Sequence, residues 1–433
     1  MTAGASAAPA SPRRRWHDRL RASLGRRLLF GGPRLPPLFY DPGYTFALPT
    51  SPLDPLRGEK VLTALDLMGL LRPGRVTAPP PASLGDLLRV HDREYLESLG
   101  DSRPFEHAFG TVLTGSQRER ALSVQRAMTG GTVAAARRAL ADGGIAVNLG
   151  GGFHHGRRDR GQGFCLFNDV AVAVAALRRS DFDGRVLVVD LDLHDGDGTR
   201  ALFATDPAVH TYSLHNRHWD DSTAVGATAI ELGGGVGDET YLAALRETLP
   251  PVFAAHRPQL VFYLAGCDPA ADDRLGDWRI TPQGMLARDR LVVELSHGGE
   301  AGSSLPLVVL TAGGYGEQAW RYTARFLVWL ASGGRRTPEL PPDDEVLIAR
   351  YRALARVLSP AELSGEPAAE TDDWGLSDED LAPALQGGTA DSRFLGYYTA
   401  HGVELVLEVM GIFDRLRDLS YEHPHIELDL SRP

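Results

Sequence analysis

Four short apolar runs, each rich in β-branched residues, recur along the middle of this 433-residue chain. They cover residues 144–149, 185–193, 259–265 and 305–311, and helical patterns such as 169–179 and 282–295 stand between them. Apolar strands that alternate with helices form parallel sheets covered by helices on both faces. The sequence therefore predicts an α/β fold with an open, mainly parallel sheet, in a single domain over residues 37–334.

The N-terminal segment, residues 1–36, differs from this domain in composition. It contains eight arginines and one aspartate, and we expect a basic arm that lacks fixed structure at its start. Trp16, Leu20, Leu24 and Leu28 recur at helical spacing among the arginines. Two interpretations stay open for this pattern: a solvated or domain-docked arm, and an amphipathic helix with a membrane-surface or targeting role.

The C-terminal segment, residues 335–433, is acidic. Between residues 337 and 433 there are 20 acidic residues and seven arginines. Helical patterns at 351–358 and 403–413 and an alternating run at 425–430 predict a small α+β appendage, in which no catalytic motif is recognisable. The net charge of the whole chain is -11, which does not favour a nucleic-acid partner, because such proteins carry broad basic surfaces.

Two further features limit the class of protein. No apolar run approaches the roughly 20 residues that cross a bilayer, so we expect no transmembrane segment. Cys165 and Cys267 are the only cysteines, too few for a disulfide framework or a four-thiolate zinc site. The sequence therefore predicts a cytoplasmic protein whose metal ligands, if any, are histidines and carboxylates.

The strongest chemical signal is the run from Val188 to Gly198. In an extended strand Asp190, Asp192 and His194 share one face, and three such groups on a buried strand are costly unless they bind something. Asp268, after the apolar run at 259–265, supplies another carboxylate at a strand end. Two carboxylates and one imidazole leave a coordination position for water, which indicates a catalytic zinc site. A purely structural Asp-rich turn is the alternative.

Two glycine-rich loops complete the set. One carries His154 and His155; near a metal, one imidazole can accept a proton from water while the other carries charge. Asp190 and Asp197 are available to orient the pair. The second loop, residues 311–316, carries Tyr315, whose hydroxyl can donate to a developing oxyanion. Taken alone, the histidine pair also fits a weak anion site, and the tyrosine also fits ordinary packing.

These segments together resemble the histone deacetylases of the arginase and deacetylase superfamily. The resemblance covers residues 37–330 and is carried, in order, by GGFHHGRRDRGQGFCLFNDVAVAV, VLVVDLDLHDGDG, TYSLH, AGCDPAADDRLGDW with ITPQG, and TAGGYG. Local motifs such as FYDPGY and NRH are most similar to the class IV branch and its bacterial relatives.

The resemblance implies a role for each matched residue. It implies zinc held by Asp192, His194 and Asp268. It implies His155 as general base, His154 as its electrostatic partner, Asp190 and Asp197 as their supports, and Tyr315 as oxyanion donor. Four residues would contact the substrate: Gly163 and Phe164, which line a narrow tunnel, with Gly313 and Gly314. A structural potassium site would map to Asp190, Asp192, His194, Ser213 and Leu214.

The implied activity is zinc-dependent hydrolysis of the amide bond of acyl-lysine, in a protein or peptide. An acetylpolyamine amidohydrolase acting on small amines and a non-catalytic acyl-lysine-binding protein are the alternatives, and a dinuclear manganese ureohydrolase fits the residue set less well. Two departures leave the acyl preference open: Asp195 stands where many members have a second histidine, and Asn216 to Trp219 lacks the phenylalanine that completes the tunnel wall. The sequence does not indicate an oligomeric state.

Overall fold

The computed structural model describes residues 35–45, 53–71, 74–298, 304–335, 339–342 and 346. The predicted helix in the basic arm and the predicted elements of the acidic C-terminal segment lie outside these residues.

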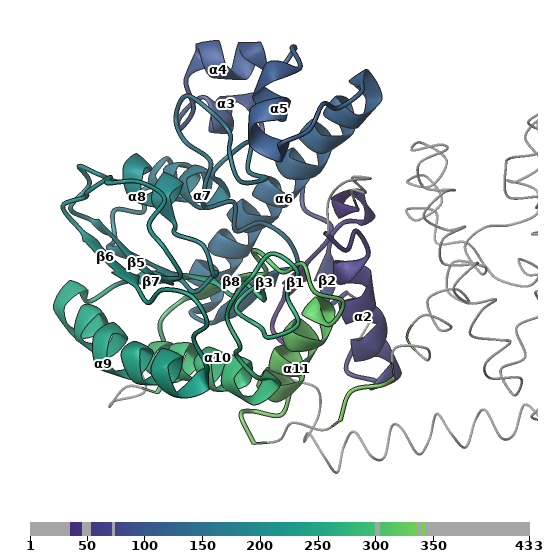
Figure 1. The fold of residues 1–433 in the computed structure, drawn as a ribbon, viewed down its shortest axis with the longest axis vertical. Coiled ribbons are helices and arrows are strands. Elements are labelled where there is room, and N and C mark those ends of the chain that lie inside the picture. Colours follow the sequence, from purple (N-terminus) through teal and green to yellow (C-terminus); the bar gives the residue numbers. More distant parts are fainter. Residues whose placement is uncertain are drawn as a thin grey trace, which may run out of the picture.

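An eight-stranded sheet, parallel throughout the described strands, forms the centre of the protein (Figure 1). In sheet order the strands are β2 (Val76–Thr77), β1 (Leu38–Phe39), β3 (Ile145–Asn148), β8 (Leu307–Leu310), β7 (Leu260–Leu264), β4 (Val186–Asp190), β5 (Val209–His215) and β6 (Ala227–Glu231). The predicted α/β class and the four predicted strands are confirmed, and the sheet is more uniform than the "mainly parallel" sheet expected from the sequence.

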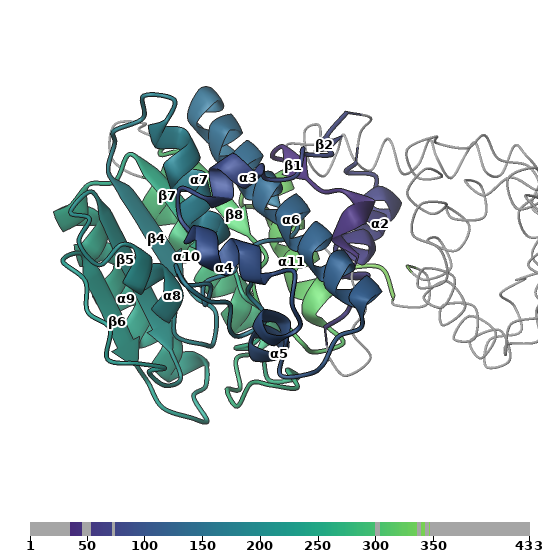
Figure 2. The same cartoon turned by 90° about the horizontal axis from the view of Figure 1, so that it is seen from above.

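Helices cover both faces of this sheet (Figure 2). One layer contains α3 (Leu84–Leu87), α4 (Arg93–Ser98), α5 (Arg103–Phe109), α6 (Gly115–Asp142), α7 (Asp169–Arg178) and α8 (Asp197–Leu202). The other contains α2 (Arg57–Leu67), α9 (Asp238–His256), α10 (Pro282–His297) and α11 (Ala319–Ala331). None of the described helices is long and apolar enough to cross a membrane.

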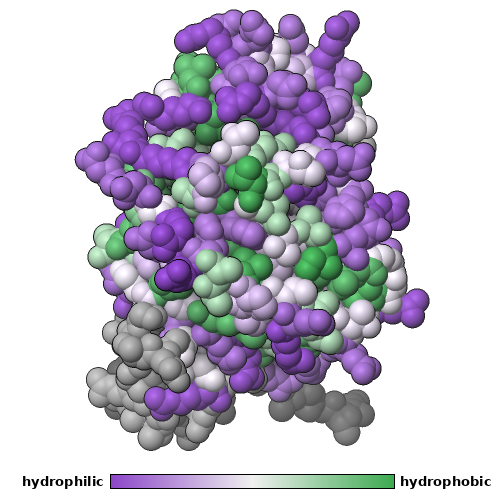
Figure 3. All heavy atoms as spheres, turned by 90° about the vertical axis from the view of Figure 1, so that its left-hand side faces the viewer, coloured by the Kyte–Doolittle hydropathy of each residue, from purple (hydrophilic) through white to green (hydrophobic). Residues whose placement is uncertain are grey.

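Strand β4 shows why the sheet needs two helical layers. Val186 and Val188 belong to the apolar core on the α6 and α7 side, whereas Leu187 and Val189 belong to the core on the α9 to α11 side. All five residues of the strand are buried, because successive side chains point to opposite faces and each face is covered. At the edge of the sheet, β6 is only partly buried, and Figure 3 shows that the surface on this side mixes hydrophilic residues with separated hydrophobic ones.

The strand order determines where loops converge. The chain leaves β3 and enters β4 three places away, and β7 and β8 later fill the positions between them. The carboxyl ends of these four parallel strands therefore lie side by side, at a point where an α/β sheet forms a crevice for ligands. Four loops meet there: 149–156 after β3, 191–196 after β4, 265–268 after β7 and 311–316 after β8.

Candidate active site

Three side chains from two of these loops form a compact group. The Nδ1 atom of His194 lies 3.2 Å from Oδ1 of Asp192 and 3.1 Å from Oδ2 of Asp268. One potential ligand atom from each residue lies within 4.8 Å of the others, the separation expected around a single metal ion. Asp192 and Asp268 are buried, whereas His194 keeps 19% of its side chain exposed.

The local geometry differs from the sequence-based expectation in one respect. Strand β4 ends at Asp190, so Asp192 and His194 do not lie on the strand but in the loop that follows. Backbone amides hold the two carboxylates in place: Gly313 N–H donates to Asp192 Oδ2 at 2.8 Å, and Leu193 N–H donates to Asp268 Oδ1 at 3.0 Å. The loop is therefore ordered by hydrogen bonds to its neighbours rather than by strand pairing.

Two glycines leave room beside the carboxylates. A Cβ atom on Gly313 would lie 2.5 Å from Oδ2 of both Asp192 and Asp268. A Cβ atom on Gly266 would lie 2.8 Å from Asp192 Oδ2 and 2.9 Å from Asp268 Oδ1. Side chains at these positions would push against the oxygen atoms that face His194, and the backbone approach that glycine permits keeps the group intact.

The charge of this group also favours a cation. Burial beside Asp192 raises the pKa of Asp268 to about 7. Although burial acts in the opposite direction, hydrogen bonds to Asp192 and Asp268 raise the pKa of His194 to about 11. The carboxylates therefore stabilise a positive charge between themselves and the imidazole, and a metal ion competes with a proton for that place. The donor set of two carboxylates and one imidazole fits Zn²⁺ in an open catalytic site.

The histidine pair lies against this group. His154 and His155 have ring centroids 4.0 Å apart, and the His155 ring lies 6.1 Å from that of His194. Nδ1 of His154 is 2.8 Å from Asp190 Oδ2, and Nδ1 of His155 is 2.6 Å from Asp197 Oδ1. Each imidazole thus has one carboxylate that sets its orientation, in the pairing expected from the sequence.

The two imidazoles differ in charge. Burial works against protonation of His154, but Asp190 and Asp192 outweigh it and raise its pKa to about 10. Burial, with the nearby charge of His154, lowers the pKa of His155 to about 4. At neutral pH the pair therefore contains one charged imidazole and one neutral imidazole that can accept a proton.

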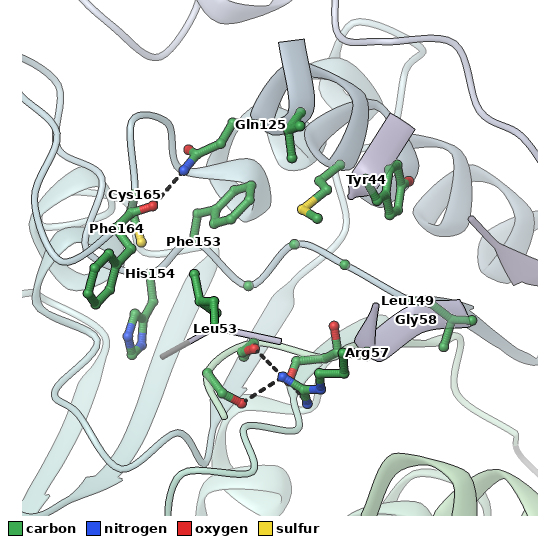
Figure 4. Close-up of a pocket in the computed structure, with 18 of the residues that line it drawn as sticks. Tyr44, Leu53, Arg57, Gly58, Gln125, Leu149, Phe153, His154, Phe164 and Cys165 are labelled. Atoms are coloured by element: carbon green, nitrogen blue, oxygen red, sulfur yellow. Dashed lines mark hydrogen bonds between the residues drawn. The ribbon is translucent and has the colours of Figure 1, made fainter. Parts of the chain in front are cut away.

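Tyr315 and the tunnel residues border a cavity of about 150 Å³ that the histidine pair also lines. Figure 4 shows His154 and Phe164 among its lining residues. Burial raises the pKa of Tyr315 well above its ordinary value, so its hydroxyl stays protonated and can donate a hydrogen bond. Gly163, Phe164 and Gly313 line the same cavity. Gly314 is not among the lining residues, although a Cβ atom there would lie 2.9 Å from Nη1 of Arg57, which lines the cavity.

Arg57, from α2, is a site residue that the sequence analysis missed. Its guanidinium donates to the backbone carbonyls of Thr311, Ala312 and Gly313 at 3.0 to 3.1 Å (Figure 4). Arg57 therefore holds the loop that carries Tyr315. A lone arginine in a helical pattern, more than 250 positions away from its partners, gives no local signal of this role.

One part of the cavity was not predicted either. Apolar and aromatic side chains from the segment around η1 (Pro42–Tyr44), from α6 and from the end of β3 line it, including Tyr40, Tyr44, Met128 and Leu149. Tyr44 donates its hydroxyl to Asn148 Oδ1 at 3.0 Å, which fixes one wall. These residues lie far apart in the sequence and only the sheet topology brings them together.

The residues expected at a potassium site lie next to the histidine pair. Asp190 in β4 pairs in register with Ser213 in β5, and Leu214 is the next residue of that strand. Gly196 N–H lies 3.4 Å from Ser213 Oγ, and Ser213 Oγ lies 2.8 Å from Nδ1 of His215. The oxygen atoms of Asp190 and Ser213 are thus close in the fold, and the potassium itself stays a prediction.

A second group of potential metal ligands contains Asp195, His215 and His218, whose ligand atoms also lie within 4.8 Å of one another. Both oxygens of Asp195 already accept hydrogen bonds from Arg200, at 2.5 and 2.7 Å. Arg200 therefore supplies the positive charge beside Asp195. Among the described residues, no arginine donates to Asp192 or Asp268 in the other group.

The family model described as the histone deacetylase domain matches residues 51–330. Over 293 residues the chain is 33% identical to histone deacetylase 2 of Arabidopsis thaliana, covering 63% of this chain and 72% of the relative. Over 316 residues it is 30% identical to histone deacetylase 8 of Xenopus tropicalis, covering 67% and 82% of the two chains.

Two bacterial proteins are similar over a comparable length. An uncharacterized protein of Picosynechococcus sp. is 33% identical over 288 residues, which cover 64% of this chain and 92% of that protein. The crystal structure of a histone deacetylase homologue from Aquifex aeolicus matches with a TM-score of 0.60 and 26% identity, covering 73% of this chain and 88% of the homologue.

Proposed function

The chain belongs to the histone deacetylase family, and on this premise we propose that it hydrolyses the amide bond of acyl-lysine with zinc as its metal. The observation that carries the proposal is the joint arrangement of Asp192, His194 and Asp268 beside a histidine pair in which each ring is held by its own carboxylate. A metal-ligand group and a base beside it, here His155 with its ring centroid 6.1 Å from that of His194, are the parts that metal-assisted hydrolysis requires.

Zinc, when bound, would polarise the acyl carbonyl and make a nearby water molecule more acidic. His155 is neutral at pH 7 and accepts the proton of the attacking water, while Asp197 holds its ring in position. His154 carries a positive charge and stabilises negative charge that develops beside it. Tyr315 donates its hydroxyl to the carbonyl oxygen as that atom becomes an oxyanion. The departing amine takes a proton from the histidine pair.

The cavity supports an acyl group longer than acetyl. Its volume is about 150 Å³, and the residues that line it include His155 and apolar side chains such as Met128 and Leu149. An acyl chain seated there would replace water against apolar surface, which is favourable in proportion to the buried area. This agrees with the similarity of local motifs to the class IV branch, and membership of that branch is part of the proposal.

Further features of the proposal follow from the family and the sequence. We propose a structural potassium ion at Asp190, Asp192, His194, Ser213 and Leu214, a cytoplasmic location, and a catalytic domain over residues 37–334 with a basic arm and an acidic appendage. Protein or peptide acyl-lysine is the proposed substrate, and acylated small amines are the alternative.

The proposal is tested by hydrolysis of a panel of lysine peptides with acyl groups from acetyl to myristoyl, together with acetylpolyamines. Wild type, His155→Ala and the control His297→Ala, which changes a histidine in the last turn of α10, are compared with bound zinc quantified. Turnover of the peptides that is lost only in His155→Ala supports the proposal. If the wild type hydrolyses acetylpolyamines but no peptide, the result favours the small-amine alternative. If the zinc-loaded wild type hydrolyses none of the substrates, the result contradicts the proposed activity.

A further inference from the structure

A groove of about 570 Å³ lies along α7, and it shares no lining residue with the active-site cavity. Ala171, Val174, Ala175 and Arg178 of α7 line it, and their spacing places all four on one face of the helix. Further lining residues come from the C-terminal ends of α3 and α8, which both contact α7 (Figure 1). This α7 groove is therefore separate from the cavity that carries the proposed chemistry.

The floor of the α7 groove is apolar. Val90, Val174 and Phe203 line it although each exposes 6% or less of its surface, so they form its base rather than its edge. Ala171 and Ala175, one helical turn apart, project only a methyl group each, which lets another chain segment approach the helix closely. An apolar side chain seated on this floor would be withdrawn from water, which is favourable in proportion to the buried area.

The edge of the α7 groove is positively charged. One carboxylate, that of Asp206, lines it together with four exposed arginines, which are Arg89, Arg158, Arg178 and Arg179. Arg178 pairs with Asp206 at 2.6 Å, so the lining keeps three net positive charges. The whole chain has a net charge of -11, and a local group of positive charges on such a chain attracts negatively charged partners.

Three of these arginines are available to a ligand. Arg89 and Arg179 form no ion pair within the described residues, and the guanidinium of Arg158 comes no closer than 3.9 Å to Asp92. A guanidinium can bind a carboxylate through two parallel hydrogen bonds. The α7 groove therefore fits a chain segment in which carboxylates stand beside apolar side chains.

The C-terminal region of this chain contains such a segment. Residues 362–381 include eight carboxylates and no lysine or arginine, together with Leu363, Trp374, Leu376 and Leu381. The segment lies outside the described residues. Its composition is complementary to the α7 groove in both respects, since it offers negative charges for the edge and large apolar side chains for the floor.

The chain is long enough for this segment to reach the groove. Val346, the last described residue, packs in the core on the α9 to α11 side of the sheet, whereas the groove lies on the α6 and α7 side. Trp374 follows 28 positions later, and a connection of that length extends to about 90 Å. Helix α6, which runs across the domain in Figure 2 and has 28 residues, is only about 42 Å long.

We propose that the α7 groove binds residues 362–381 of the same chain, with their carboxylates on the arginines at its edge and Trp374 on its apolar floor. Attachment to the same chain gives the segment an effective concentration in the millimolar range, so individually weak contacts suffice to fill the groove. This inference is independent of the proposed hydrolysis, because no residue of the groove lines the active-site cavity.

The test measures how tightly a labelled synthetic peptide of residues 362–381 binds to full-length proteins, by fluorescence anisotropy at low salt. Wild type is compared with a neutral-segment variant, which carries Asp372→Asn, Asp373→Asn, Asp378→Asn, Glu379→Gln and Asp380→Asn. Two further proteins add a charge reversal to the neutral-segment variant. One adds Arg89→Glu and Arg179→Glu in the groove. The matched control adds Arg103→Glu and Arg137→Glu, exposed arginines of α5 and α6 that form no ion pair within the described residues. Thermal unfolding establishes that each protein is folded.

We expect the peptide to bind the neutral-segment variant at least about tenfold more tightly than wild type, whose groove is already filled by its own segment. The groove reversal should weaken this binding at least about tenfold, because charge-assisted hydrogen bonds are lost, and the control reversal should leave it unchanged. Equal affinities of the groove and control reversals overturn the inference. Equal affinities of wild type and the neutral-segment variant also overturn it, and would assign the groove to an acidic segment of another protein.

Discussion

Replacing Gly163 by alanine should move the proposed general base without touching the metal ligands. A Cβ atom at this position would lie 2.2 Å from Cδ2 of His155, whereas ordinary contacts begin near 3.4 Å. The imidazole or the loop must therefore shift by about 1 Å. The ring cannot turn away freely, because Asp197 holds Nδ1 at 2.6 Å and Trp219 stacks on its face.

Displacement of a catalytic group by about 1 Å can cost on the order of 100-fold in rate. We therefore expect kcat/KM of Gly163→Ala for an acyl-lysine peptide to fall about 100-fold. Bound zinc, measured by elemental analysis, should stay at the wild-type level, since Asp192, His194 and Asp268 make no contact with the new methyl group within the range of the clash.

The control for this variant is Gly143→Ala. Gly143 ends helix α6 with a φ of 61°, close to the φ of 53° at Gly163, so alanine is strained by a similar amount at either position. No atom lies within 4 Å of a Cβ atom built on Gly143. Equal loss of kcat/KM in both variants would attribute the effect to backbone strain, and full activity of Gly163→Ala would refute the argument from the His155 contact.

Three further predictions concern the site and its support. Tyr315→Phe should lower kcat about 100-fold to 1000-fold with zinc retained, since one oxyanion donor is lost; a kcat within a factor of a few of wild type would exclude that role. Asp268→Ala should lose both bound zinc and activity, and chelation of the wild-type metal should abolish turnover until zinc is returned, both followed by elemental analysis and kinetics. Burial lowers the pKa of His91 to about 4, although the hydrogen bond that its ring donates to the Arg157 carbonyl acts in the opposite direction; the other ring nitrogen accepts from Asn168 N–H. An unfolded histidine has a pKa of about 6.5, so this contribution to stability is complete above that pH and declines as the pH falls towards 4, by at most about 3 kcal/mol. Across this pH range, the free energy of unfolding measured with denaturant should fall more steeply for wild type than for His91→Gln. Parallel pH profiles for the two proteins would contradict the assignment.

The chemistry of the candidate site could be anticipated because its residues stand in short motifs at strand ends. Asp192, His194 and Asp268 each follow an apolar run, and parallel strands bring their carboxyl ends to one edge of a sheet. Side-chain alternation also correctly indicated the two buried faces of β4. It failed just beyond Asp190, where hydrogen bonds to Gly313 and Asp268 replace strand pairing, because such tertiary contacts leave no periodic signal in the sequence.

Arg57 and Trp219 show what the motifs could not predict. Arg57 lies more than 250 positions before the loop it holds, and Trp219 follows a strand whose local pattern departs from the family. Each acts through contacts whose geometry depends on how several elements pack together, rather than on residue spacing within one element.

The sequence by itself determined the α/β class, the strands that carry the site and the kinds of side chain available for metal binding and proton transfer, because hydrophobic periodicity and short motifs are local properties. Only the tertiary structure decided the strand order, the cavity between β3 and α6, the different charges of His154 and His155, and the stacking of Trp219 on the proposed base. Burial and charge at a given atom depend on neighbours from distant parts of the chain, and those neighbours are known only once the chain has folded.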